Sequence, residues 1–235
     1  MGFYEKYVKR FLDIICSFFF IVFFFWVYII IAIIVLIKMG SPVLFKQPRP
    51  GIVKNGKETI FDLYKFRTMT DKRDESGKLL SDDQRLTKFG AMLRSTSLDE
   101  LPEIFCVLRG TMSIVGPRPQ LVRDMVFMSD EHRMRHTAKP GITGLAQVNG
   151  RNAVSWEEKL DWDLKYIENV SLFADAKILF RTVTTVIKRS GITDGYNATA
   201  LDYGDALLKE GKVSKQQYDT LLLKSKEILE EYQKR

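Results

Sequence analysis

Cysteine and histidine are scarce in this sequence, whose 235 residues include 2 Cys and 2 His. Cys16 and Cys106 lie far apart in apolar surroundings, so we interpret them as buried free thiols in a reducing compartment. His132 and His136 are four positions apart on an expected helix, but no third ligand lies near them in the sequence. This scarcity argues against a disulfide-stabilised scaffold and against a zinc site.

Charge, glycine and proline are all absent from residues 14–37. This apolar run would form a helix of roughly 36 Å, which is enough to cross the hydrocarbon core of a bilayer. It is too long for the apolar part of a cleavable signal peptide, and no small-residue cleavage site follows it. The sequence therefore predicts a membrane-anchoring helix within residues 1–39, preceded by a basic, amphipathic stretch at residues 1–13 that fits an interfacial helix.

The sequence leaves two topologies open for this anchor. Three cations lie on each side of the apolar run: Lys6, Lys9 and Arg10 before it, and Lys38, Lys46 and Arg49 after it. Such a balance gives no inside–outside asymmetry and favours a re-entrant helix with both ends on the cytoplasmic side. Against the re-entrant reading, the run holds no proline or glycine that would bend it. We expect the re-entrant arrangement, with a spanning helix as the alternative.

Acidic residues are fewer than basic ones. The chain has 36 Lys and Arg against 29 Asp and Glu, a net charge of +7. A basic balance suits nucleic acid, an anionic membrane surface or a phosphate-rich substrate. Because of the membrane anchor we expect membrane lipids and a phosphate-bearing partner, and no nucleic acid. The sequence does not indicate the oligomeric state.

Beyond the anchor, short strands and amphipathic helices are expected. Strands are predicted at 43–45, 59–69 and 112–115, with a rigid turn around Arg49 at 47–51 and a glycine-rich turn at 139–144. Helices are predicted at 84–94, at 101–109 before Gly110, and at 120–137, 156–169, 172–189 and 205–233, the last as a hairpin. The fold class is therefore α+β and mostly helical: a membrane-embedded helix, a compact domain over 40–190 with short strands and amphipathic interfacial helices, and a polar C-terminal extension over 191–235.

Two adjacent carboxylates, Asp99 and Glu100, lie at a helix start. Ser97 and Glu100 have the spacing of a capping box, which would place both carboxylates in the first helical turn. Pro102 would then remove a hydrogen bond just beyond that turn, so a second reading starts the helix near Pro102. In either reading the carboxylates lie at a break between elements. Alone, the pair indicates no more than capping.

Proline and glycine also surround several arginines and amides. Two prolines and a glycine fix the backbone around Arg118, whose planar guanidinium suits a phosphate but would equally suit a structural turn. After residue 144, Gln147 and Arg151 lie between small residues that let backbone N–H groups approach a ligand. Each stretch is weak evidence by itself.

Together, these segments resemble one family, the small monotopic phosphoglycosyl transferases of bacteria. The matching segments follow the family's order over roughly residues 5–190 and are 9–13, 48–51, 64–69, 94–102, 113–119 and 140–144. The resemblance implies that residues 40–190 form a catalytic domain, which faces the cytoplasm at the bacterial cytoplasmic (inner) membrane. It also implies the reaction: transfer of a sugar-1-phosphate from a UDP-sugar to polyprenol (undecaprenyl) phosphate with release of UMP, the first membrane step of glycoconjugate assembly.

The resemblance further implies roles for individual residues. In the family, the aspartate matching Asp99 attacks the phosphate next to the sugar and forms a covalent phosphosugar intermediate, and the glutamate matching Glu100 serves a bound Mg²⁺. We therefore expect Asp99 and Glu100 to be catalytic and to bind the metal. Substrate and phosphate binding is expected from Lys65, Arg94, Arg118, Gln147 and Arg151. A carboxylate can attack phosphorus, and a diphosphate calls for cationic groups and Mg²⁺ around it.

One departure and two rival functions remain. The family usually carries a Ser-Pro pair midway along the membrane helix, whereas the positions near Phe25 and Trp26 hold no proline.

A membrane-bound, Mg²⁺-dependent hydrolase of nucleotide-diphosphate sugars is the first rival function, and it would use water in place of the lipid phosphate. A non-enzymatic membrane scaffold would only bind anionic lipid. The sequence identifies neither the sugar nor the glycan pathway.

Overall fold

The computed structural model describes residues 2–150, 154–187 and 201–234 and is mostly helical with short strands, in agreement with the expected class. The first half contains η1 Tyr4–Lys9, α1 Arg10–Met39, β1 Leu44–Lys54, β2 Lys57–Phe66, α2 Asp82–Arg85, α3 Lys88–Ser95, η2 Leu98–Glu100 and α4 Glu103–Arg109. The second half contains β3 Ser113–Val115, α5 Val122–Met125, α6 Asp130–Arg133, η3 Met134–Thr137, β4 Gly141–Thr143, α7 Leu145–Val148, α8 Trp156–Glu168, α9 Leu172–Ile187, α10 Tyr203–Lys209 and α11 Lys215–Gln233.

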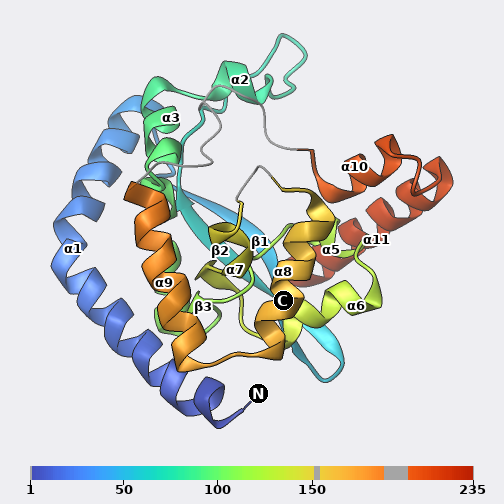
Figure 1. Cartoon of the computed structure of the whole chain (residues 1–235). Helices are drawn as coiled ribbons and strands as arrows, with labels where there is room; N and C mark the ends of the chain where they lie inside the picture. Colours follow the sequence, from blue (N-terminus) through green and yellow to red (C-terminus); the bar gives the residue numbers. More distant parts are fainter. Residues whose placement is uncertain (1, 151–153, 188–200, 235) are drawn as a thin grey trace.

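The predicted apolar helix is α1, which runs without interruption and continues the π-helical turn η1. Figure 1 shows α1 curving along one side of the molecule, with α10 and α11 on the opposite side. Residues 4–39 form one helix that is long and apolar enough to cross a membrane, and only 11% of its most apolar window is buried. Most of its surface therefore faces outward and is not part of a protein core.

Hydrogen bonds attach α1 to the rest of the protein along its length. The Arg10 guanidinium donates to the carbonyls of Val107 and Leu108, at 2.7 and 2.8 Å. Further along the helix, the Tyr28 hydroxyl donates to the carbonyl of Leu101 at 3.0 Å. The last turns contribute Ile31 and Val35 to a buried apolar cluster with Phe66 and Leu93. Both ends of α1 therefore lie against the same folded domain.

The strands form two small sheets. β1 and β2 pair as an antiparallel hairpin with an irregularity between Pro50 and Val53. The turn predicted at 47–51 is wrong, because Pro48, Arg49 and Pro50 pair with β2 as part of β1. A two-stranded ribbon tolerates these prolines because the missing N–H groups can lie on an edge.

The second sheet consists of β3 and β4, which pair in parallel, with Ser113 opposite Gly141 and Val115 opposite Thr143. The glycine-rich turn predicted at 139–144 thus contains a strand. A Cβ atom on Gly116 would lie 2.2 Å from the carbonyl oxygen of Lys139, so this close approach requires glycine. The pairing fixes the chain just before Arg118.

Three predicted elements differ in detail. The helix predicted at 84–94 is divided into α2 and α3 by an extended residue, Leu86. The helix predicted at 120–137 is broken into α5, α6 and η3. The break lets three consecutive apolar residues, Val126, Phe127 and Met128, all face the core, which a regular helix does not permit. Cys106 is buried as expected, but Cys16 is exposed on α1.

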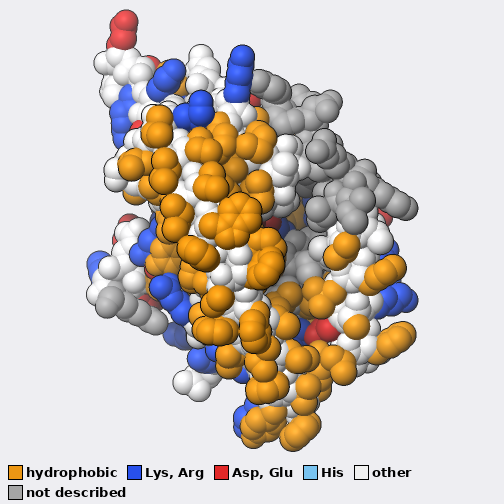
Figure 2. Space-filling model, turned by 90° about the vertical axis from the view of Figure 1, so that its left-hand side faces the viewer, with side chains coloured by type: hydrophobic (Ala, Val, Ile, Leu, Met, Phe, Trp, Pro, Cys, Tyr) orange, Lys and Arg blue, Asp and Glu red, His pale blue; other side chains and the backbone are white. Residues whose placement is uncertain are grey.

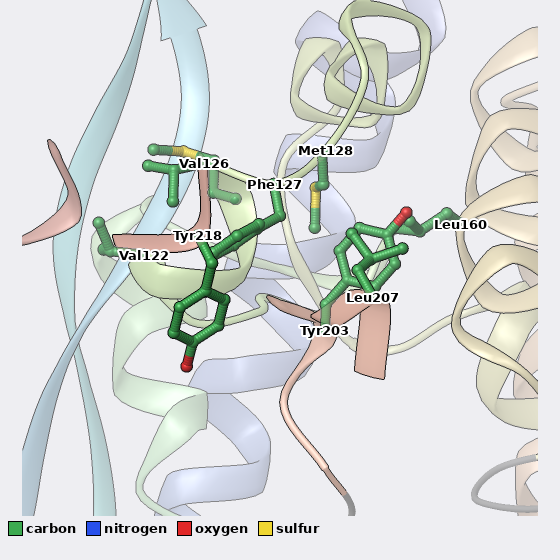
Figure 3. Packing of buried hydrophobic residues seen from close by; sticks show 9 residues of the cluster. Val122, Val126, Phe127, Met128, Leu160, Tyr203, Leu207 and Tyr218 are labelled. Atoms are coloured by element: carbon green, nitrogen blue, oxygen red, sulfur yellow. The ribbon is translucent and has the colours of Figure 1, made fainter. Parts of the chain in front are cut away.

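The C-terminal hairpin is formed by α10 and α11, and it packs into the protein core. Tyr203 and Leu207 of α10 and Tyr218 of α11 join one buried cluster with residues from the α5 region and α8. Figure 3 shows Tyr203 and Leu207 beside Met128 and Leu160, and the Tyr218 ring beside Phe127. The extension is polar in overall composition, yet its few apolar side chains are spaced to give each helix one buried face.

Candidate active site

The local structure around the two carboxylates follows the second sequence reading. Ser97 has a left-handed backbone, with φ of 57°, and within the described residues its side chain makes no capping hydrogen bond. The prediction that Ser97 and Glu100 form a capping box is therefore wrong. Asp99 and Glu100 belong to the short 3-10 helix η2, and α4 begins at Glu103 directly after Pro102. Proline has no N–H to donate, which suits the position before a helix begins.

Glu100 is held by two cations from different elements. The Lys65 ammonium at the end of β2 lies 2.5 Å from Glu100 Oε1. Arg118 Nη2 donates to the same oxygen and Arg118 Nη1 lies 3.4 Å from Oε2. Burial alone would raise the pKa of Glu100, but Arg118 and Lys65 outweigh it and hold that pKa well below its ordinary value. Glu100 is therefore an anion throughout the physiological pH range.

The neighbouring carboxylate, Asp99, is in a different electrostatic state. Its side chain is buried, and burial together with the negative charge of Glu100 raises its pKa from 3.8 to about 6. Lys65, Arg94 and Arg118 act in the opposite direction but do not cancel the shift. A poorly solvated carboxylate of this kind binds a proton, a metal ion or an electrophile more readily than a solvated one.

A third carboxylate, Glu103 in the first turn of α4, lies beside the pair and was not expected from the sequence. Its Oε1 lies 3.2 Å from the Lys65 ammonium, and its side chain is almost completely buried. Burial and the charge of Glu100 raise the pKa of Glu103 to about 6. The sequence signal for it was the acidic residue directly after Pro102, within one helical turn of Asp99.

The structure brings together five of the expected site residues. Arg94 lies in the last turn of α3, its Nε donates to Thr68 Oγ1 at 3.0 Å, and its charge acts on Asp99. Lys65 and Arg118 bind Glu100 as described above. Gln147 of α7 is elsewhere: its amide donates to the Ile142 carbonyl at 2.9 Å, and it is not among the described residues around the cavity below. Arg151 lies outside the described residues.

A cavity of about 190 Å³ opens beside these groups. Among the described residues, its lining is mainly charged, with one aromatic residue, and comes from several distant segments: Arg49, Leu63, Lys65, Glu103, Arg118, Pro119, Gln120, Leu121, Asp124, Trp156 and Asp202. Arg49, which was noted in the sequence only as part of a turn, donates to the Pro119 carbonyl at 3.0 Å. Burial, reinforced by the charge of Arg118, lowers its pKa to about 10. No local pattern marked Asp124, Trp156 or Asp202.

Asp99 and Glu100 are the candidate ligands for a divalent cation. Within the described parts of the chain, no three His, Cys, Asp or Glu residues are grouped so that they could hold a metal by themselves. Mg²⁺ needs no such cage, because one or two carboxylates suffice when substrate phosphates and water complete its shell. Asp99 and Glu100 are adjacent carboxylates, and burial, followed by the negative charge of Glu100, raises the pKa of Asp99, so a cation bound there would stabilise its ionised form. The pair therefore fits Mg²⁺ bound together with a phosphorylated substrate.

Comparisons with known proteins place the chain among bacterial sugar transferases. The family described as "Bacterial sugar transferase" matches residues 4–189. The chain is 47% identical to the "Uncharacterized sugar transferase EpsL" of Bacillus subtilis (strain 168) over 193 residues, which cover 82% of this chain and 94% of that protein.

Two longer relatives are also similar. Identity is 36% over 204 residues to the "Undecaprenyl-phosphate galactose phosphotransferase" of Salmonella typhimurium, covering 80% of this chain and 42% of the relative. It is 40% over 185 residues to the "UDP-glucose:undecaprenyl-phosphate glucose-1-phosphate transferase" of Klebsiella pneumoniae, covering 74% and 39%. The chain thus spans less than half the length of these two relatives.

Proposed function

The chain belongs to the bacterial sugar transferase family, and on that premise we propose that it transfers a sugar-1-phosphate from a UDP-sugar to polyprenol (undecaprenyl) phosphate and releases UMP. The observation that carries the proposal is the buried Asp99–Glu100 pair, surrounded by Lys65, Arg94 and Arg118 beside a charged cavity. Several fixed cations next to a poorly solvated carboxylate match a diphosphate substrate and a nucleophile. Relatives named for undecaprenyl phosphate transfer support the same reaction.

In the proposed reaction, a carboxylate oxygen of Asp99 attacks the phosphorus that bears the sugar. The new Asp99–phosphorus bond forms as the phosphoanhydride bond to UMP breaks, and UMP leaves with the bonding electrons. A phosphate oxygen of the polyprenol phosphate then attacks the same phosphorus and releases Asp99 as a carboxylate. The covalent phosphosugar on Asp99 conserves the energy of the anhydride between the two half-reactions.

The surrounding residues supply charge and position. Arg118 and Lys65 hold Glu100 in place in the absence of substrate, and both cations line the cavity where the diphosphate would lie. Arg94 acts electrostatically on Asp99 and is held by its hydrogen bond to Thr68. Mg²⁺, held by Asp99 and Glu100 together with substrate phosphates, would neutralise charge that develops on the leaving UMP. For Gln147 and Arg151 we propose, from the family resemblance, a contribution to substrate binding.

We further propose that α1 is a re-entrant anchor in the bacterial cytoplasmic membrane, with both of its ends and the catalytic domain on the cytoplasmic side. Two observations support this. The start of α1 is fixed to α9 by the Lys9–Asp175 ion pair, and its end packs against Phe66 and Leu93. A single folded domain that contacts both ends of the helix cannot lie on both sides of a hydrocarbon core of roughly 30 Å, so both ends would stay on one side of the membrane. Figure 2 shows hydrophobic side chains covering the outer face of α1, which would contact lipid.

UMP release distinguishes the proposal from its rivals. The full-length protein is incubated in detergent with a panel of UDP-sugars and Mg²⁺, with and without polyprenol phosphate. If the protein forms UMP over multiple turnovers only when polyprenol phosphate is present, the result supports the transferase. Equal turnover without the lipid would instead identify the hydrolase. No UMP from any UDP-sugar, together with binding to anionic vesicles, would favour the membrane scaffold.

A further inference from the structure

The segment 201–234 lies beyond the part of the chain that matches the family, which ends at residue 189. It is nevertheless a fixed part of the protein, because Tyr203, Leu207 and Tyr218 complete a buried cluster (Figure 3). The fit is close: a Cβ atom on Gly204 would lie 2.4 Å from the ring of Phe127. Packing of this density holds the start of α10 in one position relative to α5.

This docking brings one carboxylate of the segment, Asp202, into the cavity beside the site. Asp202 lies at the N-cap of α10, where an aspartate ordinarily accepts a hydrogen bond from its own helix. Within the described residues it makes no such bond. Its Oδ2 instead lies 2.8 Å from Arg123 Nη1, and the side chain lines the cavity that also holds Lys65 and Arg118.

The same docking fixes an aromatic wall. The Trp156 indole donates to the carbonyl of Leu201 at 2.9 Å, and its ring packs against that of Tyr203 at a tilt of 34°, with centroids 5.3 Å apart. Trp156 and Asp202 therefore line one cavity and are both positioned by the C-terminal segment. Neither contact is available to a chain that ends where the family match ends.

The charge around Arg123 indicates that Asp202 is not needed there only as a counter-ion. Arg123 also contacts Asp205, whose Oδ1 lies 3.1 Å from Nη2, so one guanidinium faces two carboxylates. Asp202 thus shares Arg123 with Asp205 and also lines the cavity. A carboxylate with free acceptor capacity, next to an aromatic ring, is suited to a polyhydroxylated ring: the oxygens accept hydrogen bonds from hydroxyl groups and the ring covers an apolar face.

We propose that Asp202 is a specificity-determining residue that accepts hydrogen bonds from ring hydroxyl groups of the UDP-sugar, which packs against Trp156 in the same cavity. The inference rests on the proposed function, since Lys65 and Arg118 on the cavity wall would bind the diphosphate to which such a ring is attached. The hydroxyl groups belong to the transferred sugar or to the ribose, and these two sources have the same chemistry. The C-terminal segment would thereby contribute directly to substrate binding and, where the hydroxyl groups are those of the transferred sugar, to the choice of sugar.

The test compares Asp202→Asn with Asp205→Asn in the full-length protein. Asparagine keeps an oxygen for Arg123 but loses the charge, and Asp205 contacts Arg123 without lining the cavity. Steady-state UMP release is measured for the UDP-sugar that the wild type uses best. We expect Asp202→Asn to raise KM about tenfold or more, because hydrogen bonds to charged groups typically contribute about that factor, with a smaller effect on kcat. Asp205→Asn should leave KM within about twofold of the wild-type value.

Substrate analogues identify the hydroxyl group. A UDP-sugar lacking the recognised hydroxyl group should be used equally well by the wild type and by Asp202→Asn. If that group is on the ribose, the inhibition constant of UMP also rises in Asp202→Asn; if it is on the transferred sugar, the constant is unchanged. An unchanged KM in Asp202→Asn, or an equal rise in Asp205→Asn, would overturn this inference while leaving the transferase activity intact. A wild-type protein that releases no UMP would overturn the proposed function, and this inference with it.

Discussion

Arg135 and Asp163 form an ion pair that is almost completely buried, with Arg135 Nη2 2.6 Å from Asp163 Oδ2. The same Nη2 donates to the backbone carbonyl of Arg118 at 2.6 Å. Arg135 is the second residue of η3 and Asp163 lies on α8, so the pair connects these two elements. It positions the backbone of Arg118, whose side chain binds Glu100.

Breaking this pair is expected to destabilise the protein. Asp163→Leu leaves the Arg135 guanidinium buried without its partner, which typically costs about 3–5 kcal/mol. Combining it with Arg135→Met removes the unpaired charge and should restore much of that stability. Denaturant unfolding in detergent measures both effects. If Asp163→Leu alone is as stable as the wild type, the expectation is contradicted.

The same double variant separates stability from positioning. It lacks the donor to the Arg118 carbonyl, so UMP release should stay well below the wild-type rate even where the fold has recovered. Wild-type activity in a stable double variant would show that Arg118 does not depend on Arg135.

Asp99→Asn tests the nucleophile. The substitution keeps the shape of the side chain and removes the attacking anion, so turnover should fall by several orders of magnitude. No phosphosugar adduct should then be trapped from UDP-sugar alone, as read by mass spectrometry of the intact protein. Asp219→Asn, an exposed change on α11, is the control and should behave as wild type. Turnover near the wild-type rate in Asp99→Asn would exclude the covalent role.

The pH dependence follows from the raised pKa of Asp99. Only the ionised carboxylate attacks, and its pKa is raised to about 6, so activity is full above that value and is lost as the pH falls through it. We expect kcat/KM for the UDP-sugar to fall about tenfold per pH unit below roughly pH 6. Glu103 has a similar pKa, and so the profile is repeated with Glu103→Gln. If kcat/KM of the Glu103→Gln variant no longer falls at low pH, the fall in the wild type is caused by protonation of Glu103 and not of Asp99.

Glu100→Gln tests the metal. A neutral amide is a weaker ligand for Mg²⁺ than a carboxylate, so a higher Mg²⁺ concentration should be needed for half-maximal activity and the maximal rate should fall strongly. Mg²⁺ titration of UMP release measures both. Undiminished wild-type activity in excess chelator would rule out the Mg²⁺ requirement.

The topology is tested by placing a cysteine at Gly2 in a protein in which Cys16 and Cys106 are replaced by serine. With both ends of α1 on the cytoplasmic side, an impermeant thiol reagent should label this cysteine only after the cells are lysed. A cysteine at Gly211, in the turn between α10 and α11, serves as the cytoplasmic control. Labelling of the Gly2 position in intact cells would show that the helix spans the membrane.

Features that depend on neighbouring residues were predictable from the sequence. The uncharged run at 14–37 predicted α1, and Gly110 correctly marked the end of α4, where its backbone is left-handed. The Asp99–Glu100 pair was located at a break between elements. Here hydropathy, proline and glycine act within a few residues, so the sequence carries the information directly. The capping box was wrong because Pro102 and the left-handed Ser97 together move the helix start to Glu103.

Contacts between distant segments were decided only by the tertiary structure. The sequence alone determined that a basic chain with an apolar anchor carries two adjacent carboxylates and a proline-flanked Arg118 suited to a phosphate, and it pointed to Lys65 only through resemblance. That these cations meet at Glu100, with Lys65 35 positions away from it, follows from how β2, η2 and β3 pack. The raised pKa of Asp99 and the position of Asp202 arise in the same way. Burial and charge proximity depend on the sum of all neighbours in space, which no local sequence pattern encodes.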